Sequence, residues 1–389
     1  LHKKQSLVAL AFGTLALGIA EFVMMGILPD VSRYFDVSIP TAGHCISAYA
    51  LGVCCGAPLL VAFHKYPLKR LLLFLAGLIL FGAALSAMAQ SFVMLVVARF
   101  ISGLPHGAYF GVASIVAVKL ADEAHKTSAV SIMVAGMTVA NLFGVPLATA
   151  LSSHISWRFP FMLLIFISII VIYYVWKWIP ASVGALPDEG FRHQFAFLRH
   201  GAPWLILAAT MLGNGGIFCW YSYVSPLLTS VGGFPHEALS ALMIAAGFGM
   251  VAGNLISGRL CDRHRPGHVA AVTQTITIAT LLLIFLLAGY GWISAALMVV
   301  CTGCLFALSS PQQFLILKHA PGGELLGGAA IQVAFNLGNA IGAFCGGLPM
   351  EHGATPRWSA LVGVPFVVMG LVAFICFCRK YERRSAAVD

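Results

Sequence analysis

The sequence predicts an all-α integral membrane protein with twelve transmembrane helices in two pseudo-symmetric six-helix bundles. Three observations lead to this prediction. First, 60% of the 389 residues are hydrophobic and only 9% are charged, whereas about 25% are charged in a typical soluble domain. Second, twelve apolar segments follow one another, and most reach the roughly 20 residues that a helix needs to cross the bilayer core. Third, the segments divide into two matching sets of six.

The apolar segments are spaced evenly along both halves of the chain. In the first half they span residues 6–28, 42–63, 70–89, 92–118, 127–150 and 159–179. In the second half they span residues 203–228, 238–258, 269–288, 292–317, 325–348 and 358–378. They lack the alternation of apolar and polar residues that marks a strand of a membrane β-barrel, so we expect helices. Glycine and proline occur inside the segments, which helices in lipid tolerate.

The positions of lysine and arginine predict the orientation of the chain in the membrane. With an even number of spans, both termini face the same side. Eighteen of the 22 basic residues lie at the termini or in the connections that share their side. The exceptions are Arg33, Arg158 and Arg357 in the opposite connections and Arg99 inside a segment. Because basic residues gather on the cytoplasmic side, we expect both termini in the cytoplasm. The net charge of +9 then reflects topology and needs no nucleic-acid partner.

A long connection separates the two sets of segments. It predicts an N-terminal bundle over residues 1–179, a cytoplasmic linker over 180–202, and a C-terminal bundle with a short cytoplasmic tail over 203–389. Within the linker, Phe191 and Leu198 follow helical spacing together with Phe195. This spacing favours a short amphipathic helix on the membrane surface.

Several features of the first half recur in the second at an offset of 197 residues. Gly52 and Gly56 correspond to Gly249 and Gly253, and Pro29, at the predicted end of the first segment, corresponds to Pro226. Two repeats of this kind suit a transporter that carries its site near the midplane between them. The alternative is chance, because Gly-x-x-x-Gly pairs are common in helical membrane proteins.

Four longer motifs carry a resemblance to a known family. They are Gly18-Ile-Ala-Glu21-Phe22-x-x-x-Gly26-Ile-Leu-Pro29, Arg99-x-x-Ser102-Gly103-x-Pro105-His106-Gly107, Gly136-Met-Thr-Val-Ala-Asn141-Leu-x-Gly144-x-Pro146 and Gly258-x-Leu-x-Asp262-Arg263. Over nearly its whole length the chain resembles the major facilitator superfamily, and most of all the twelve-span drug and sugar efflux group with its bacterial arabinose efflux permeases. The resemblance implies the major facilitator fold, alternating access, a place in the bacterial inner membrane and a monomer.

One departure from the family concerns the cytoplasmic loops. The loop motif is kept from Gly258 to Arg263, but between the second and third segments Lys65 stands where the family has aspartate. We therefore expect Asp262 and Arg263 to form part of the cytoplasmic gate and to matter more than their first-half counterpart.

A second departure concerns the antiporter signature of the fifth segment. The family pattern Gly-x-x-x-Gly-Pro-x-x-Gly-Gly reads here Gly136-x-x-x-Ala140-Asn141-x-x-Gly144. This weakens the argument for export over import. A proton-coupled importer and an uncoupled facilitator of the same fold therefore stay as alternatives.

Glu21 is the only acidic residue well inside an apolar segment. A carboxylate in hydrocarbon is costly, so it should face a cavity, have a partner or carry a proton. Arg99 is the expected partner, because at about 1.5 Å per residue both lie at a similar depth. His106 follows Arg99 on the same helix face. We interpret Glu21, Arg99 and His106 as a proton-coupling site. The alternative is a static pair that holds the first and fourth segments together.

Amide and aromatic side chains predict where a substrate would bind. Asn214, Phe218 and Tyr221 share one face of the seventh segment, and Gln312 and Asn336 could add hydrogen bonds. Such groups suit a small neutral or amphipathic solute, either sugar-like or drug-like. The alternative is that the aromatic residues belong to the interfacial belt and the amides join helices. A further residue, His44 near the start of the second segment, is predicted to be part of a gate.

Other functional classes need residues that the sequence does not supply. We find no Gly-x-x-x-x-Gly-Lys-Ser/Thr motif for ATP and no cluster of groups that would make a membrane enzyme. We expect no cofactor, and as partners a small-molecule substrate, protons and membrane lipid. Cys301 and Cys304 lack a second pair, and Pro266 separates His264 from His268, so we expect no metal site. A non-transporting membrane sensor stays open as a different class.

Overall fold

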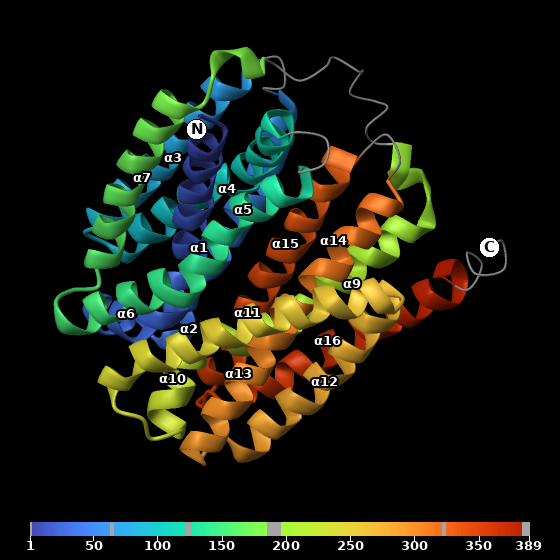
Figure 1. Ribbon diagram of the computed structural model, residues 1–389. Coiled ribbons are helices and arrows are strands. Elements are labelled where there is room, and N and C mark those ends of the chain that lie inside the picture. Colours follow the sequence, from blue (N-terminus) through green and yellow to red (C-terminus); the bar gives the residue numbers. More distant parts are fainter. Residues whose placement is uncertain (1, 63–65, 122–125, 185–195, 321–323, 383–389) are drawn as a thin grey trace.

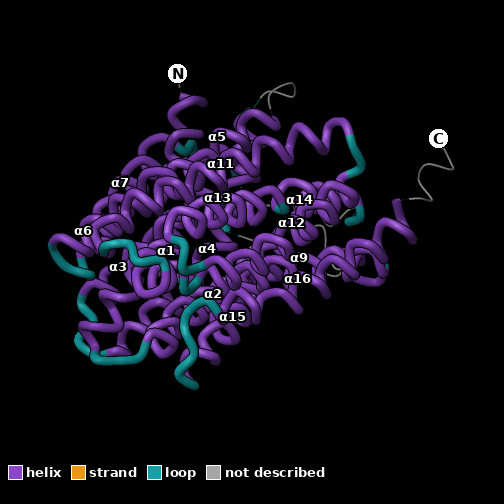
Figure 2. Tube along the Cα trace, turned by 90° about the horizontal axis from the view of Figure 1, so that it is seen from below, coloured by secondary structure: helices purple, strands orange, loops and turns teal. Residues whose placement is uncertain are grey.

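The computed structural model describes residues 2–62, 66–121, 126–184, 196–320 and 324–382 (Figure 1). Every secondary-structure element in these ranges is a helix. A helix satisfies its own backbone hydrogen bonds, which is what a segment surrounded by lipid requires. Figure 2 shows the described loops at the ends of the helices.

The helices form two sets along the chain. The first set comprises α1 (His2–Phe35), α2 (Ile39–Ala62), α3 (Leu68–Ala87), α4 (Phe92–Leu120), α5 (Lys126–Val139), the π-helical turn η2 (Ala140–Gly144), α6 (Val145–His154) and α7 (Phe159–Trp178). The second set comprises α9 (Gly201–Tyr221), α10 (Val224–Pro226), η5 (Leu227–Val231), η6 (His236–Ala238), α11 (Leu239–Arg263), α12 (Pro266–Leu287), α13 (Gly291–Ala307), α14 (Ser309–Lys318), α15 (Glu324–Glu351), α16 (Trp358–Phe377) and η7 (Cys378–Glu382). Two short 3-10 turns, η3 (Ala181–Val183) and η4 (Ala196–Arg199), lie between the sets.

Each predicted segment coincides with one helix or with consecutive helices. Eleven helical stretches of the described residues are long and apolar enough to cross a membrane. The twelfth is α2, which has 24 residues without a charged side chain and packs between the spanning helices α4 and α15. The predicted all-α membrane fold is confirmed.

Helix α1 is longer than the first apolar segment. It has 34 residues and continues past Pro29 to Phe35, so the prediction that Pro29 ends the segment is wrong. A proline inside a helix leaves the carbonyl four residues earlier without its usual N–H donor. That carbonyl belongs to Met25, and the Ser225 hydroxyl of α10 donates to it. The helix can continue because another part of the chain supplies the missing donor.

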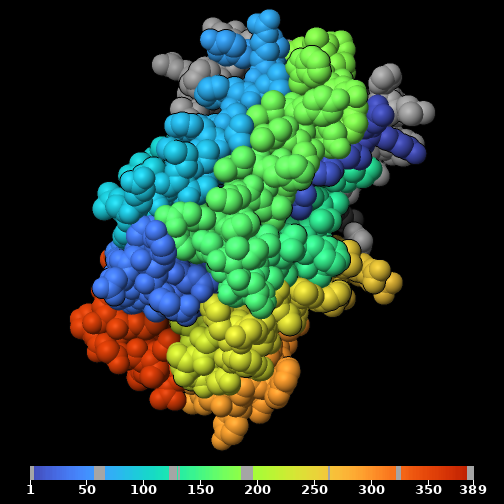
Figure 3. All heavy atoms as spheres, turned by 90° about the vertical axis from the view of Figure 1, so that its left-hand side faces the viewer, coloured from blue at the N-terminus to red at the C-terminus, as the bar shows by residue number. Residues whose placement is uncertain are grey.

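The two sets of helices pack mainly within themselves and meet along a few elements. In the first set α1 packs on α5 and α7, and α4 packs on α2 and α3; in the second set α9 packs on α15 and α16, and α11 packs on α13. Between the sets, α2 lies along α15, and α11 lies against η2 and α6. In Figure 3 the first set occupies the upper part of the face and the second set the lower part.

The division at residues 180–202 stays a prediction. Phe191 and Phe195 of the predicted amphipathic helix lie outside the described residues, and Leu198 belongs to the 3-10 turn η4.

The repeated glycines make the same kind of helix contact in both sets. A Cβ atom at Gly56 of α2 would collide with the Leu104 carbonyl of α4, and one at Gly253 of α11 would collide with the Gly303 carbonyl of α13. The backbones therefore approach each other as closely as glycine allows. This shared packing favours a true repeat over chance recurrence of glycines.

We predict that Gly56→Ala and Gly253→Ala each lower the thermal unfolding temperature of the protein in detergent. The added methyl group meets backbone rather than a movable side chain, and overpacking of this kind costs about 1–3 kcal/mol. Gly77→Ala is the matched control, because a Cβ there has nothing within 4 Å. Equal unfolding temperatures for Gly253→Ala and Gly77→Ala would contradict the proposed contact.

Candidate functional site

Glu21, Arg99 and His106 lie together between α1 and α4. All three are buried, with 4%, 0% and 1% of their surface exposed. His106 Nε2 lies 3.9 Å from Glu21 Oε2. Arg99 donates a hydrogen bond of 2.6 Å to the carbonyl of Ala20, the residue before Glu21. The structure therefore brings the three residues of the predicted proton-coupling site to one place.

A fourth residue of this cluster, Tyr49 of α2, was not among the sequence predictions. Its hydroxyl lies 2.8 Å from His106 Nδ1, and the Arg99 guanidinium stacks on its ring, 4.4 Å from the centroid. Tyr49 thus contacts both Arg99 and His106. In the sequence it is an ordinary tyrosine of an apolar segment, and nothing there distinguishes it from a packing residue.

Glu21 and Arg99 are close enough to interact electrostatically, but no direct ion pair joins them in the described part of the chain. The nitrogen that lies beside the Glu21 carboxylate is His106 Nε2, and the Arg99 guanidinium donates to a backbone carbonyl. Glu21 Oε1 and Arg99 Nε and Nη1 are buried without hydrogen-bond partners among the described residues. Buried groups in this state are costly.

One aromatic ring joins this cluster to the second set of helices. Phe22 follows Glu21 in α1, and its centroid lies 6.4 Å from that of Phe218, 6.3 Å from that of Tyr221 and 6.0 Å from that of Phe306. Phe218 and Tyr221 belong to α9 and Phe306 to α13. Phe218 and Tyr221, two of the predicted substrate-binding residues, therefore pack on the residue that follows Glu21 in the chain.

The predicted amide residues are buried and incompletely paired. Asn214 Nδ2 donates to Gln312 Oε1 at 3.2 Å, which brings α9 and α14 together. Asn336 Nδ2 donates to the Gln332 carbonyl of its own helix at 3.0 Å. Asn214 Oδ1, Gln312 Nε2 and Asn336 Oδ1 have no partner among the described residues. These side chains therefore hold unused donor and acceptor atoms in the interior.

The predicted gate residues lie in two different places. His44 of α2 stacks on Phe344 of α15, with ring centroids 6.2 Å apart, so it lies between the two sets of helices. Arg263 is exposed at the last residue of α11. The side chain of Asp262 and all of Lys65 lie outside the described residues.

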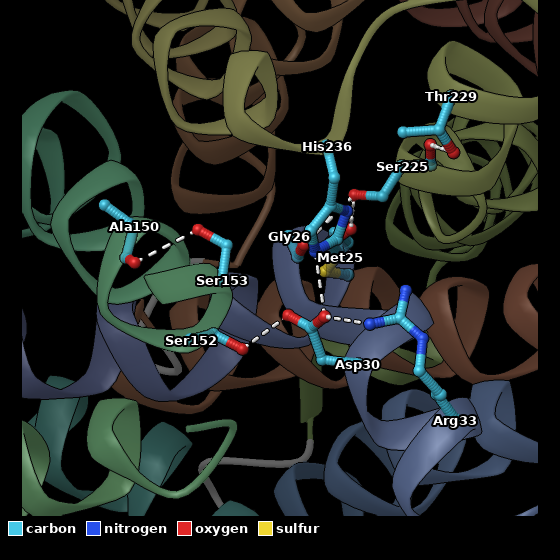
Figure 4. A network of polar contacts seen from close by, with 10 residues as sticks. All are labelled: Met25, Gly26, Asp30, Arg33, Ala150, Ser152, Ser153, Ser225, Thr229 and His236. Carbon is cyan, nitrogen blue, oxygen red and sulfur yellow. Dashed lines mark hydrogen bonds and ion pairs between the residues drawn. The ribbon is translucent and has the colours of Figure 1, made fainter. Parts of the chain in front are cut away.

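Most of the hydrogen bonds between the two sets lie towards the end of the molecule where Asp30 of α1 lies, which we call the Asp30 end; the contact of the Cys54 thiol with the Val333 carbonyl lies further from it. The Ser47 hydroxyl of α2 donates to the Ala340 carbonyl of α15 at 2.9 Å, and the Ser240 hydroxyl of α11 donates to the Pro146 carbonyl of α6 at 2.9 Å. His236 contacts Asp30 itself (Figure 4). The two sets are therefore held together at this end.

Three side chains at the other end of the molecule could in principle hold a metal ion. The ligand atoms of His268, Cys378 and Glu382 lie within 4.8 Å of one another. Glu382 accepts a hydrogen bond of 2.7 Å from the backbone N–H of Gly267 and lies 3.1 Å from His268 Nδ1. A carboxylate at the first turn of α12 is stabilised by the helix dipole and by these contacts, which accounts for the arrangement without an ion.

Comparison with known proteins places the chain in a family. The family model described as Major Facilitator Superfamily matches residues 10–331. A protein of Escherichia coli (strain K12) named AraJ is 45% identical over 385 residues, which cover 99% of this chain and 97% of the relative. A Streptomyces lividans protein described as "Chloramphenicol resistance protein" is 30% identical and covers 94% of each chain. A Helicobacter pylori (strain J99) protein described as "Probable sugar efflux transporter" is 25% identical, covering 89% of this chain and 87% of the relative.

The fold also resembles that of solved transporters. The crystal structure of a bacterial homologue of the human lysosomal transporter Spinster, described as inward-facing and unoccupied, superposes with a TM-score of 0.78. The superposition covers 98% of each chain at 16% identity, so it concerns the fold alone. Together with the family match and the relatives, it shows that the chain belongs to the Major Facilitator Superfamily and is a multi-pass membrane transporter, not an enzyme.

Proposed function

We propose that the protein is a proton-coupled secondary transporter that exports a small neutral or amphipathic solute, sugar-like or drug-like, by alternating access. It lies in the bacterial inner membrane as a monomer with both termini in the cytoplasm. The observation that carries the proposal is the buried Glu21 carboxylate, which contacts His106 and has one oxygen without a partner. An intramembrane carboxylate of this kind is by default a candidate functional site.

The proposed proton site acts through the charge of Glu21. When the carboxylate is ionised it is attracted to Arg99 and lies beside His106, whose other ring nitrogen contacts the Tyr49 hydroxyl. A proton on Glu21 removes that attraction and the cost of burying the charge. Since Tyr49 belongs to α2, and α2 packs along α15 of the second set, a change at the carboxylate can alter the contact between the two sets.

The proposed substrate site lies between the sets, close to the proton site. Asn214, Gln312 and Asn336 have unused donor and acceptor atoms, and Phe218 and Tyr221 supply aromatic faces beside them. The description of one relative names chloramphenicol resistance, and that of another names sugar efflux. These descriptions support a neutral solute with polar groups and favour export. All five side chains are buried, so substrate enters when the sets separate.

The closed Asp30 end supports a resting state that opens towards the termini. If the termini are cytoplasmic, the Asp30 end faces away from the cytoplasm, and the solute site opens inwards. Asp262 and Arg263 at the end of α11 would then form part of the gate that closes the cytoplasmic side in the opposite state, while His44 contributes to closure at the Asp30 end.

We predict that Glu21→Gln abolishes accumulation without abolishing binding. Glutamine is nearly isosteric with a protonated glutamate, so the fold and the solute site persist. Energised inside-out vesicles with the wild-type protein should concentrate the solute and release it after an uncoupler, whereas the variant should only equilibrate it. Glu351→Gln, at an exposed residue of α15, is the matched control. Downhill flux by the wild type that an uncoupler does not change would favour an uncoupled facilitator. Accumulation of the solute in right-side-out vesicles would favour an importer, and binding of the solute without flux would favour a sensor.

We predict that Tyr49→Phe slows proton-driven transport about fivefold and changes its pH profile. The variant keeps the ring under Arg99 but loses the hydroxyl at His106, and a hydrogen bond of this kind contributes about 1 kcal/mol. Tyr109→Phe removes a buried hydroxyl that has no partner among the described residues, so its profile should match that of the wild type. Identical profiles for the two variants would assign Tyr49 to packing only.

We predict that Asn214→Ala weakens binding of the preferred solute about tenfold, but weakens binding of its deoxy analogue less. A buried amide discriminates by being left unsatisfied when the matching hydroxyl is missing. A thermal-shift screen of sugars, nucleosides and amphipathic drugs identifies the solute to be used. The control is Thr210→Val, because Thr210 lies one turn earlier in α9 and its hydroxyl bonds to the Ile206 carbonyl of its own helix. Unchanged binding by Asn214→Ala would place the solute elsewhere.

A further inference from the structure

Asp30 lies near the end of α1 at the centre of a polar network that the proposed transport mechanism has not used (Figure 4). The Ser152 hydroxyl of α6 donates to Asp30 Oδ2 at 2.6 Å. His236 Nε2 lies 2.8 Å from Asp30 Oδ1. Arg33, one turn further along α1, lies 3.7 Å away and is largely exposed. The carboxylate is thus contacted on both of its oxygens.

The two closest contacts differ in what they join. Ser152 and Asp30 both belong to the first set of helices, so their hydrogen bond orients the carboxylate within that set. His236 begins η6, the turn that leads into α11 of the second set. The contact between Asp30 and His236 therefore crosses from one set to the other, between residues 206 positions apart in the chain.

A second contact between the sets lies beside the first. Pro29 leaves the Met25 carbonyl free within α1, and the Ser225 hydroxyl of α10 donates to it. Ser225 also lies 3.3 Å from the Gly26 carbonyl. The segment of α1 from Met25 to Asp30 is thus bound at one point by α10 and at another by η6, and both partners belong to the second set.

Burial makes the Asp30 contact stronger than a typical surface ion pair. The Asp30 side chain is 10% exposed and that of His236 is 25% exposed. Pairs that are fully exposed contribute little because water and side-chain freedom offset the attraction. Here the carboxylate is shielded and held in place by Ser152. Other charged groups nearby, Arg33, Glu237 and His154, are exposed.

We infer that Asp30 and His236 form a clasp that holds the Asp30 end closed, with Ser152 as its positioning residue, and that opening towards this side requires the clasp to break. The inference rests on the proposed alternating access. It does not depend on proton coupling, on the direction of transport or on the identity of the solute. In this inference, the clasp shifts the equilibrium between the two access states towards the one that is closed at the Asp30 end.

A cysteine at position 47 can report whether this end is open. Ser47 lies in α2, and its hydroxyl donates to the Ala340 carbonyl of α15 across the two sets. Ser47→Cys is a small change, and because the side chain is only partly exposed, separation of the two sets should raise the rate of its reaction with a maleimide in detergent. Detergent removes any dependence on orientation in a membrane. The ten native cysteines give a background that is measured in the protein without Ser47→Cys and subtracted.

The clasp variants are compared in the Ser47→Cys background. We expect Asp30→Asn and His236→Gln each to raise the labelling rate of Cys at this position at least about fivefold, since each changes one partner of a shielded hydrogen bond. The double variant should label no faster than the faster single variant, because both changes break one contact. Ser153→Ala should label at the parent rate, as the Ser153 hydroxyl donates only to the Ala150 carbonyl of its own helix (Figure 4).

Two results would overturn the clasp. One is a parent-like labelling rate in both single variants, and the other is a double variant whose effect is the product of the two single effects. If Asp30→Asn purifies poorly, His236→Gln decides alone, because His236 is more exposed and lies in a short turn. Solute flux is measured separately: a wild-type protein without flux refutes the proposed function, while the labelling rates still test the clasp.

Discussion

The fold depends on one constraint: a polar group buried in a membrane protein must find its partner inside the protein. Glu21 is the most demanding of these groups, because a carboxylate is costly in a medium of low dielectric constant. Its neighbours satisfy it only in part. His106 contacts one oxygen, the other oxygen has no partner among the described residues, and Arg99 is directed to the Ala20 carbonyl and to the ring of Tyr49. A group held in this state is sensitive to a proton, and that sensitivity is the basis of the proposed coupling.

The same constraint also builds the contact between the two sets of helices. Pro29 removes a backbone donor in α1, and Ser225 of the second set satisfies the carbonyl of Met25 that it leaves free. Asp30 follows directly and contacts His236. Glycines build the contacts within each set, since Gly56 and Gly253 allow helices of one set to touch along their backbones. Close packing joins the helices within each set. Between the sets, α2 packs along α15 and Phe22 packs on aromatic rings of α9 and α13, while polar contacts gather near Asp30. Breaking the polar contacts near Asp30 would let the sets separate at that end while each set keeps its own packing.

The apolar segments were sufficient to predict the helices, because segment length and composition decide what crosses a membrane. Glu21, Arg99 and His106 were recognisable since charged or titratable residues inside such segments are rare. Tyr49 and Phe22 carried no such signal, as aromatic residues are common in apolar helices and only their neighbours give them a role. The contact of Asp30 with His236 joins the last part of α1 to the turn η6, far away in the chain, and no periodicity links them. Depth along the helices correctly placed Arg99 near Glu21, but depth does not determine which atoms meet, and the guanidinium bonds to the Ala20 carbonyl rather than to the carboxylate.

Infrared difference spectroscopy tests the central claim, a change in the protonation of Glu21 during the transport cycle. The spectrum of the purified protein is recorded with and without the solute that the thermal-shift screen identifies. A buried protonated carboxyl group gives a C=O stretching band well separated from the amide bands. The proposed mechanism predicts that solute binding changes the intensity of this band and that the change is missing in Glu21→Gln. A difference spectrum without a carboxyl band, or the same band in Glu21→Gln, would contradict it.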